Sequence, residues 1–377
     1  MPRSYLDHAS TSPIRPAALE AMVGWFRPDG GGHPGDPGRI HAEGMSSRVA
    51  LETAREQVAQ LVGARPREVV FTSGGTESIA MASYGALERG PARRVVLPAI
   101  EHSAVRQWAE RGEPVVVGVD RLGRVDPEEL LSQVDDRTAL VHLQWGNHEV
   151  GTCQVLEPVV ERCREAGLLV HVDAAQAVGR VPVDFGALGA DLLTLSGHKF
   201  GAPPGTGALL VRRGVRVPPL LLGGDQERAR RAGMENVPAL VGLGAAAEEV
   251  AAVLPEEQQR CEQLTARVID WADRTDGVQL LGDRERRLPH LVCLGIEGIE
   301  PQPVLLGLDR VGVSVHSGSS CSSEALEPSP VLQAMGVDAE RSLRVSVGWD
   351  TTDEDVDRLL AALPEVLDGL RSLGGRA

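Results

Sequence analysis

Lysine is the residue that this sequence almost entirely lacks. Lys199 is the only lysine, and the other 37 of the 38 basic residues are arginine. An arginine guanidinium stays protonated and cannot form a Schiff base, whereas a desolvated lysine amine can lose its proton near neutral pH and attack a carbonyl. A coding preference for arginine with one accidental survivor would give the same count. The single amine is therefore either incidental or reserved for chemistry.

Paired cysteines and long apolar runs are also missing. The five cysteines form no Cys-x-x-Cys pair, and no histidine cluster accompanies them at the spacing of a zinc site. The first residues hold no apolar signal segment, and no run approaches the length of a membrane span. The formal charge of −15 argues against nonspecific binding to nucleic acid or anionic membranes. We expect a cytoplasmic protein that holds no metal and binds neither nucleic acid directly nor membranes.

Apolar segments and helical patterns alternate through the first two thirds of the chain. This alternation predicts an α/β fold with a mostly parallel sheet that helices cover on both faces. The last two strands lie too close in sequence for a helix between them, so one of them should be antiparallel. The seven expected strands are Val69–Thr72, Arg94–Leu97, Pro114–Val119, Ala139–Trp145, Leu168–Val172, Leu192–Leu195 and Ala208–Val211.

A smaller α+β domain is expected after about Gly277, where the strands and helices become shorter. We predict a large domain over 15–254 and a small domain over 1–14 and 255–377, with the N-terminal strand joining the small one. Two helices, Val237–Leu254 and Glu256–Asp273, are expected on either side of Pro255. A final helix should run from Asp353 to about Leu373.

Three segments at strand ends carry groups that could act together. The turn Thr72–Ser78 opens a helix, and its glycines would let the backbone and the helix N-terminus approach an anion; an ordinary turn capped by Thr76 is the alternative. Asp173 ends another strand and could pair with a protonated pyridine nitrogen, although it could equally be a solvated strand end. Lys199 follows a third strand. Open α/β sheets place their ligands at this edge. The three segments would therefore meet in one crevice, where they could bind a phosphate, a ring nitrogen and an aldehyde carbon.

Three further residues have both a chemical and a structural interpretation. His102 follows a strand at the same edge and could stack on a cofactor ring and move protons, or simply cap the next helix. Cys321 lies in a run of small polar residues that cannot pack a core. Such a segment suits a nucleophilic thiol that must move into a site and out again, although Cys321 could equally be an incidental surface thiol. Arg344 lies within a strand and could grip a substrate carboxylate, or form an internal ion pair.

Taken together, these segments resemble the cysteine desulfurases of the iron–sulfur and nitrogen-fixation type, which are pyridoxal-phosphate enzymes of the class V aminotransferase family. The resemblance covers nearly the whole chain, because the motifs occur in the family's order and spacing. They are Tyr5–Pro13, Phe71–Ser78, Glu101–Ser103, Asn147–Gly151, His171–Gly179, Ser196–Lys199, Gly223–Arg228, Ser317–Ser323 and Ser342–Gly348.

The resemblance implies a fold-type-I homodimer with active sites at the subunit interface and a large domain built on the seven-stranded sheet. Lys199 would hold pyridoxal phosphate as a Schiff base, Asp173 would face the pyridine nitrogen and His102 would stack over the ring. Gln176 would contact the phenolic oxygen. The phosphate would be held by Gly75, Thr76, Ser196 and His198.

The resemblance also implies the reaction, namely removal of sulfur from L-cysteine to give L-alanine. Arg344 and Asn147 would bind the substrate, and Cys321 would attack the sulfur of the bound cysteine and carry it as a persulfide. The small-residue loop around Cys321 resembles the long-loop group, which favours transfer to an acceptor protein such as an iron–sulfur scaffold or a tRNA thiolation enzyme.

Two positions depart from the family pattern. His148 stands where the family usually has an asparagine that contacts the phenolic oxygen, and an imidazole can still donate a hydrogen bond there. Met234 replaces a threonine whose hydroxyl normally reaches the partner subunit's phosphate, and a thioether cannot donate that bond. Other readings are a pyridoxal-dependent C–S or C–Se lyase, an aminotransferase, or a noncatalytic scaffold for sulfur-transfer proteins.

Overall fold

The larger part of the chain is built around one seven-stranded sheet. The computed structural model describes residues 3–27, 35–317 and 328–374. The strands of this sheet lie in the order β2-β8-β7-β6-β5-β3-β4, and only β8 runs antiparallel to its neighbours. Their bounds are β2 (Val69–Thr72), β3 (Arg94–Pro98), β4 (Glu113–Val117), β5 (Thr138–Gln144), β6 (Val170–Asp173), β7 (Leu192–Ser196) and β8 (Gly207–Val211). The predicted sheet and its one antiparallel strand are confirmed.

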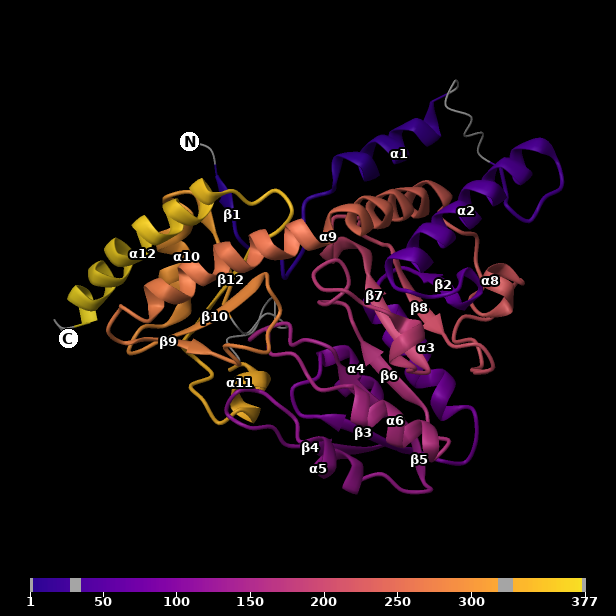
Figure 1. Cartoon of the computed structure of the whole chain (residues 1–377), viewed down its shortest axis with the longest axis horizontal. Helices are drawn as coiled ribbons and strands as arrows, with labels where there is room; N and C mark the ends of the chain where they lie inside the picture. The colour runs from indigo at the N-terminus through magenta and orange to yellow at the C-terminus, as the bar shows by residue number, and fades with distance from the viewer. Residues whose placement is uncertain (1–2, 28–34, 318–327, 375–377) are drawn as a thin grey trace.

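Helices cover both faces of this sheet, which is why its central strands read as continuous apolar runs. Alternate residues of one strand enter different cores: Val69 and Phe71 pack on one face and Val70 packs on the other. The helices around the sheet, visible in Figure 1, are α1 (Pro16–Phe26), α2 (Ala42–Leu61), α3 (Gly75–Leu87), α4 (Ser103–Ala109), α5 (Pro127–Ser132), α6 (Glu157–Glu165), α7 (Phe185–Leu188) and α8 (Gln226–Ala229), with short 3-10 turns η1 (Pro66–Glu68) and η2 (Gly197–Lys199).

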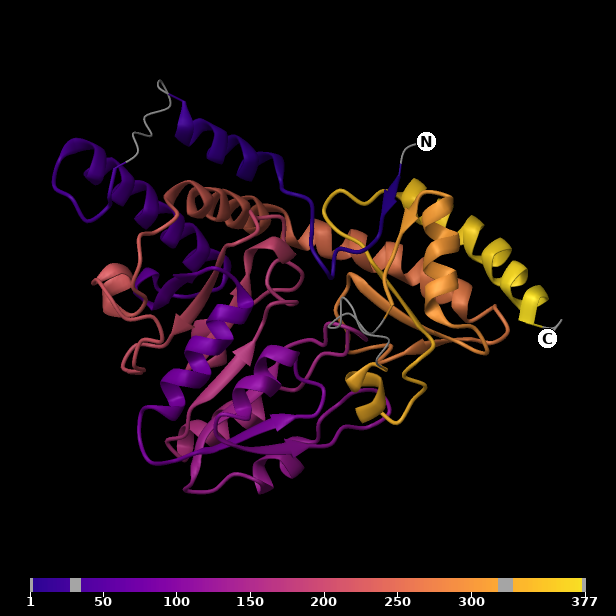
Figure 2. The ribbon, with the colours of Figure 1, turned by 180° about the vertical axis from the view of Figure 1, so that it is seen from behind.

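A second, smaller core lies at the other end of the molecule. It contains an antiparallel sheet in the order β12-β10-β9 and a two-stranded parallel pair of β1 with β11. The elements are β1 (Ser4–Tyr5), β9 (Val278–Leu281), β10 (Leu291–Ile296), α10 (Pro301–Arg310), β11 (Val313–Ser314), α11 (Pro330–Ala334), β12 (Ser342–Ser346) and α12 (Asp353–Gly374). The N-terminal strand therefore pairs within this part, and Figure 2 shows it beside α12.

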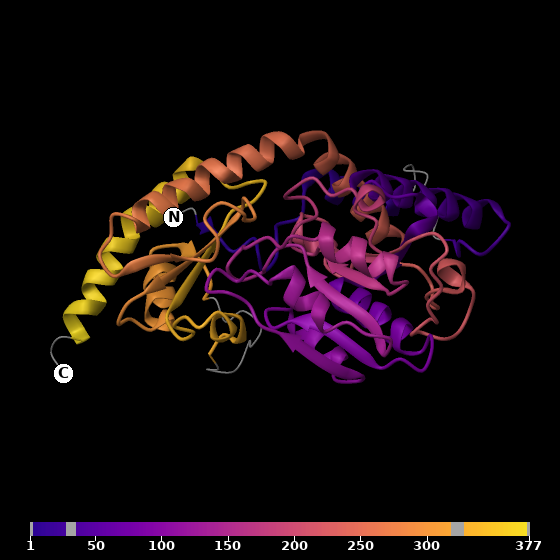
Figure 3. The same ribbon diagram turned by 60° about the horizontal axis from the view of Figure 1, so that its bottom comes forward.

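The helix α9 (Val237–Ala272) connects the two parts without a break. The prediction of two helices separated at Pro255 was wrong. Proline removes only one backbone donor, and α9 is held on both sides of it: Leu243 and Val250 pack in the core of the large part, whereas Leu264 and Val268 pack in the small one. Figure 3 shows α9 arching over both parts.

The same helix corrects the expectation that no segment approaches a membrane span. Its most apolar window of 18 residues has a mean hydropathy of 1.6, but half of that window is buried inside the fold. A core helix of a globular protein satisfies the same criterion of length and composition.

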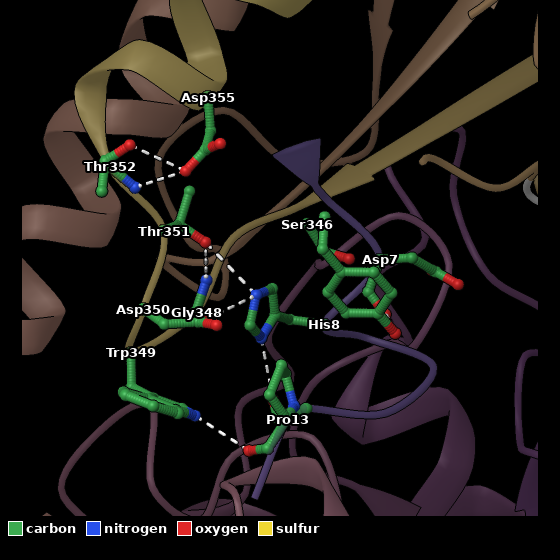
Figure 4. A network of polar contacts seen from close by, with 12 residues as sticks. Asp7, His8, Pro13, Ser346, Gly348, Trp349, Asp350, Thr351, Thr352 and Asp355 are labelled. Carbon is green, nitrogen blue, oxygen red and sulfur yellow. Dashed lines mark hydrogen bonds and ion pairs between the residues drawn. The ribbon is translucent and has the colours of Figure 1, made fainter. Parts of the chain in front are cut away.

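A polar network fixes the N-terminal segment against the connection between β12 and α12 (Figure 4). The buried His8 lies 3.0 Å from the Ser12 hydroxyl and 3.2 Å from the Thr351 hydroxyl. Trp349 Nε1 donates to the carbonyl oxygen of Pro13 at 2.9 Å. The Asp355 carboxylate accepts from the backbone N–H of Thr352 at 2.9 Å, the reciprocal contact of a capping box. These contacts tie residues 8–13 to the connection between β12 and α12, and the Ser12 N–H donates to the carbonyl oxygen of His198 at 2.9 Å, which holds the segment beside the end of β7.

Candidate active site

A cavity of about 510 Å³ lies at the carboxyl edge of the large sheet. It collects residues that follow β2, β3, β5, β6 and β7, because the carboxyl ends of parallel strands meet at one edge. The N-terminal segment and β12 close its other side. Its lining is Ala9, Ser10, Ser73, Gly74, Gly75, Thr76, Glu77, Ile79, His102, Gln144, Gly146, His148, Asp173, Ala175, Gln176, Ser196, His198, Lys199, Pro204, Gly205 and Arg344.

Lys199 lies in this cavity at the end of η2, directly after β7. Its Nζ donates to the carbonyl oxygens of Ala9 at 2.6 Å and Ser10 at 2.8 Å. Its own carbonyl oxygen accepts from Arg180 Nη2 at 2.7 Å and from the Ser12 hydroxyl at 3.0 Å. Both ends of the residue are therefore held, and the one lysine amine of the chain points into the cavity.

One end of the cavity is suited to an anion. The 13-residue helix α3 begins there, and its first N–H groups, those of Gly75, Thr76 and Glu77, have no acceptor among the described residues. Gly74 has a φ of 150°, which a side chain would oppose, and a Cβ on Gly207 would lie 2.7 Å from the Gly74 Cα. The glycines therefore permit a close packing of two backbones that leaves the helix N-terminus open to the cavity.

Ser196 and His198 also line the cavity, and Ser196 lies beside the turn before α3, because a Cβ on Gly75 would lie 3.5 Å from the Ser196 Cβ. The imidazole Nδ1 of His198 lies 3.2 Å from the Thr11 hydroxyl. Burial and the charge of Lys199 lower the pKa of His198 to about 4. A neutral imidazole can act there as a hydrogen-bond donor to an anion without adding charge.

Asp173 is placed to meet a cation in the middle of the cavity. It ends β6, and its Oδ1 accepts from the N–H of Ala175 at 3.0 Å. Gln176 also lines the cavity, and its amide donates to the carbonyl oxygen of Ala9 at 2.8 Å. Behind them, Glu101 is fully buried, and burial together with the neighbouring Asp173 raises its pKa well above the usual value. Of these two carboxyls, only Asp173 lines the cavity.

His102 caps a helix and also lines the cavity. Its Nδ1 accepts from the N–H of Ala104 at 3.1 Å, so the side chain caps α4, and the ring also lines the cavity. The ring of His148 lies edge-on to it, with centroids 5.2 Å apart and planes at 70°. His148 Nε2 is 3.6 Å from the Glu149 carboxylate. Two imidazoles thus share one wall of the cavity.

Arg344 forms the internal ion pair that was one of its two interpretations, and it also lies at the cavity. It is buried in β12 and lines the cavity. Its guanidinium donates to Asp7 at 3.0 Å, to the Ser10 hydroxyl at 2.7 Å and to the carbonyl oxygen of His148 at 2.8 Å. The Nε is buried and has no acceptor among the described residues. Arg344 therefore forms an internal ion pair with Asp7 and also presents its guanidinium to the cavity.

Asn147 does not line the cavity in the described structure. Asn147 is fully buried; its amide donates to Ile100 and Gln144, and its oxygen accepts from two backbone N–H groups. It is absent from the cavity lining. Cys321 lies outside the described residues. The described chain before it is anchored at the cavity, because the backbone of His316 bridges to that of Arg344.

Several lining residues were not predicted as site residues from the sequence, among them Ala9, Ser10, Glu77 and Gln144. Glu77 belongs to the turn that we identified, and Gln144 ends a predicted strand, so their positions alone could have suggested them. Ala9 and Ser10 meet Lys199 across about 190 residues of sequence. No local pattern reports such a contact.

The fold and the cavity together define a class of protein. The strand order with one antiparallel strand, the lysine after β7, the carboxylate after β6 and the open helix N-terminus after β2 are the arrangement of fold-type-I pyridoxal-phosphate enzymes.

Comparison with known proteins identifies the family. The model of the class-V aminotransferase family matches residues 4–359, so the chain belongs to that family. It is 40% identical to the cysteine desulfurase IscS of Methanosarcina thermophila, over 98% of this chain and 93% of that protein.

Solved structures agree. A NifS-like protein superimposes with a TM-score of 0.90 at 32% identity, over 98% of this chain and all of the other. A protein named SspA, solved in complex with cysteine, superimposes with a TM-score of 0.80 at 28% identity, over 91% of this chain and 98% of the other. The family implies the use of pyridoxal phosphate.

Proposed function

We propose that this protein is an L-cysteine desulfurase that uses pyridoxal 5'-phosphate to move sulfur from L-cysteine to its own Cys321. The observation that carries the proposal is the position of the single lysine amine, inside a cavity that also holds Asp173 and the open N-terminus of α3. Relatives named as cysteine desulfurases along nearly the whole chain support the choice of reaction.

The cavity residues fit the cofactor. Three unshared N–H groups, the Ser196 hydroxyl and the neutral His198 suit a phosphate, and the Asp173 carboxyl suits a protonated pyridine nitrogen. Lys199 would hold the aldehyde carbon, and Gln176 and His148, which line the same cavity, would contact the phenolic oxygen. When bound, pyridoxal phosphate withdraws electrons from the substrate carbons that must lose a proton and a sulfur.

The protein's own groups would position the substrate and move protons. The cationic face of Arg344 would bind the carboxylate of cysteine, helped by the hydroxyl of Ser10, which already contacts this guanidinium. His102 has its Nδ1 occupied by the N–H of Ala104, so a neutral ring carries its proton on Nε2. His102 Nε2 would exchange protons with the bound substrate. The Lys199 amine would remove protons from the substrate carbons and return them.

Sulfur transfer balances without an external oxidant or reductant. The Cys321 thiolate attacks the sulfur of bound cysteine, an S–S bond forms, the C–S bond breaks, and the carbon takes a proton to give alanine. The products are L-alanine and a Cys321 persulfide. The anchoring of His316 beside Arg344 supports this role, because the segment that carries Cys321 starts at the cavity.

A homodimer is part of the proposal, because one end of the large part exposes apolar side chains. They lie on α1, on α2 and in the segment before α9, which are neighbours in Figure 1. Patches of this kind mark interfaces. The exposed side chains are Leu19, Val23, Phe26, Met45, Val49, Leu222 and Met234.

The persulfide would pass to an acceptor protein, either an iron–sulfur scaffold or a tRNA thiolation enzyme. A cytoplasmic location is proposed with it, because reducing conditions there keep thiols free. All four cysteines among the described residues are free thiols, namely Cys153, Cys163, Cys261 and Cys293.

The test is incubation with ³⁵S-labelled or unlabelled cysteine, followed by mass analysis of the Cys321 peptide. One additional sulfur on Cys321 and release of alanine are expected. Cys321→Ala should abolish both persulfide and alanine formation. If Cys321→Ala still releases sulfide at the full rate, the protein is a C–S lyase. A purified protein that neither binds pyridoxal phosphate nor acts on cysteine would instead support the scaffold reading.

A further inference from the structure

A carboxylate lies where a phosphate is expected. Glu77 stands in the first turn of α3 and lines the cavity next to the open N–H groups. Hydrogen bonds from Arg231 and Ser73 outweigh the effect of burial and hold the pKa of Glu77 below its usual value, so it is ionised. An unpaired negative charge at this place would oppose binding of an anion.

Arg231 supplies the compensating charge. Its Nε donates to Glu77 Oε1 at 2.8 Å and its Nη2 to Oε2 at 3.4 Å. The pair is largely shielded from water, since the side chains are 12% and 23% exposed. The guanidinium is absent from the cavity lining. Arg231 therefore faces the carboxylate from behind and does not reach into the cavity.

The same carboxylate shapes the turn. Glu77 Oε2 accepts from the N–H of Ser73 at 2.7 Å, across the glycines of the turn. Arg231 fixes the orientation of that carboxylate, and so fixes which N–H groups of the turn are engaged and which are left open. The segment that carries Arg231 is itself bound to β2, because Glu227 accepts from the N–H of Phe71 at 2.8 Å.

We propose that Arg231 is a positioning residue for the phosphate subsite, acting through Glu77. It neutralises the carboxylate beside the bound anion and holds it on the backbone of the turn. Removing Arg231 leaves a charge that repels the phosphate, whereas removing both charges does not. This inference rests on the proposed use of pyridoxal phosphate.

The test measures binding of pyridoxal phosphate and of pyridoxal, which lacks the phosphate, to the full-length apoenzyme by spectroscopic titration. For Arg231→Ala we expect the affinity for pyridoxal phosphate to fall about tenfold, the effect of one charged contact, while the affinity for pyridoxal changes less than about twofold. The double variant Arg231→Ala/Glu77→Gln should recover most of the lost affinity.

Arg230→Ala is the matched control. It removes a neighbouring arginine that donates to the carbonyl oxygen of Arg67 and forms no hydrogen bond or ion pair with Glu77 among the described residues, so the ratio of the two affinities should stay unchanged. Arg231→Gln replaces Arg231→Ala if the alanine variant does not fold, and should show the same selective loss.

Equal weakening of both ligands, no weakening, or a double variant as weak as Arg231→Ala would each overturn the inference. Failure of the unmodified apoenzyme to bind pyridoxal phosphate would instead overturn the proposed function.

Discussion

The segment before α9 holds three consecutive residues in the left-handed region, and one of them offers a quantitative test. Glu227, Arg228 and Ala229 have φ values of 49°, 58° and 59°. This conformation costs a residue with a side chain about 1–2 kcal/mol. Glu227 holds the turn: its buried carboxylate accepts from both Nη atoms of Arg55 at 2.7 Å and from the N–H of Phe71. Ala229 is exposed, and its only hydrogen bond among the described residues runs from its backbone N–H to the carbonyl oxygen of Asp225 at 3.1 Å, which glycine would keep.

Ala229→Gly should therefore stabilise the protein. Glycine removes the steric cost of about 1–2 kcal/mol but adds about 0.5–1 kcal/mol of chain entropy in the unfolded state. The expected net gain is about 0.5–1 kcal/mol. Ala361→Gly is the matched control, because Ala361 is exposed inside α12 and the same substitution there should destabilise by about 1 kcal/mol.

Thermal unfolding followed by circular dichroism, under identical cofactor loading, measures both variants. For a chain of this size we expect Tm to rise by about 1–2 °C for Ala229→Gly and to fall by about as much for Ala361→Gly. If both substitutions lower Tm equally, residue 229 does not carry the strain that its φ implies, and the account of this turn is wrong.

Three other substitutions test separate features. Glu101→Gln should make the free energy of unfolding less dependent on pH. Because the pKa of Glu101 is raised in the folded protein, this carboxyl destabilises the fold as the pH rises above its usual pKa of 4.5. Urea denaturation should therefore find the variant more stable than the parent at pH 8 and not at pH 5. Met234→Thr should slow release of the cofactor in a dilution assay, because a hydroxyl can donate a hydrogen bond, while Met45→Thr should not; equal release rates for the parent and Met234→Thr would contradict the role of this position. Arg55→Ala should cost about 3–5 kcal/mol in the free energy of unfolding, because it leaves Glu227 buried and unpaired; a loss below about 1 kcal/mol in urea denaturation would show that water reaches this pair.

The sheet could be predicted from the sequence because its strands are buried on both faces. A strand such as β5 is apolar along most of its length, and the strands on either side of the short Gly201–Gly207 connection cannot be parallel neighbours. The continuity of α9 could not be predicted. Pro255 is a strong local stop signal, and the packing on both sides of it, which keeps the helix intact, comes from distant segments.

Some features of the candidate site could likewise be predicted from the sequence, and others could not. Lys199, Asp173 and the turn before α3 follow different strands, and sheet geometry alone brings them together. The ion pair of Glu77 with Arg231 joins residues 154 positions apart, and that of Arg344 with Asp7 joins residues 337 apart. Each pair joins two segments of the same part of the molecule that only the tertiary packing brings together, which a single sequence does not display. The predicted role of Asn147 gains no support, since its amide is already fully engaged.

The uninterrupted α9 makes the two parts of the molecule mechanically dependent. Lys199 belongs to the large part and Arg344 to the small one. Any change in the distance between them around a substrate must therefore also move α9, which both parts share. A rotation of the small part would have to bend α9, and the bend costs least at Pro255, where no N–H is present to lose a hydrogen bond. Pro255, which the sequence predicted as a helix end, would then be the point at which α9 bends.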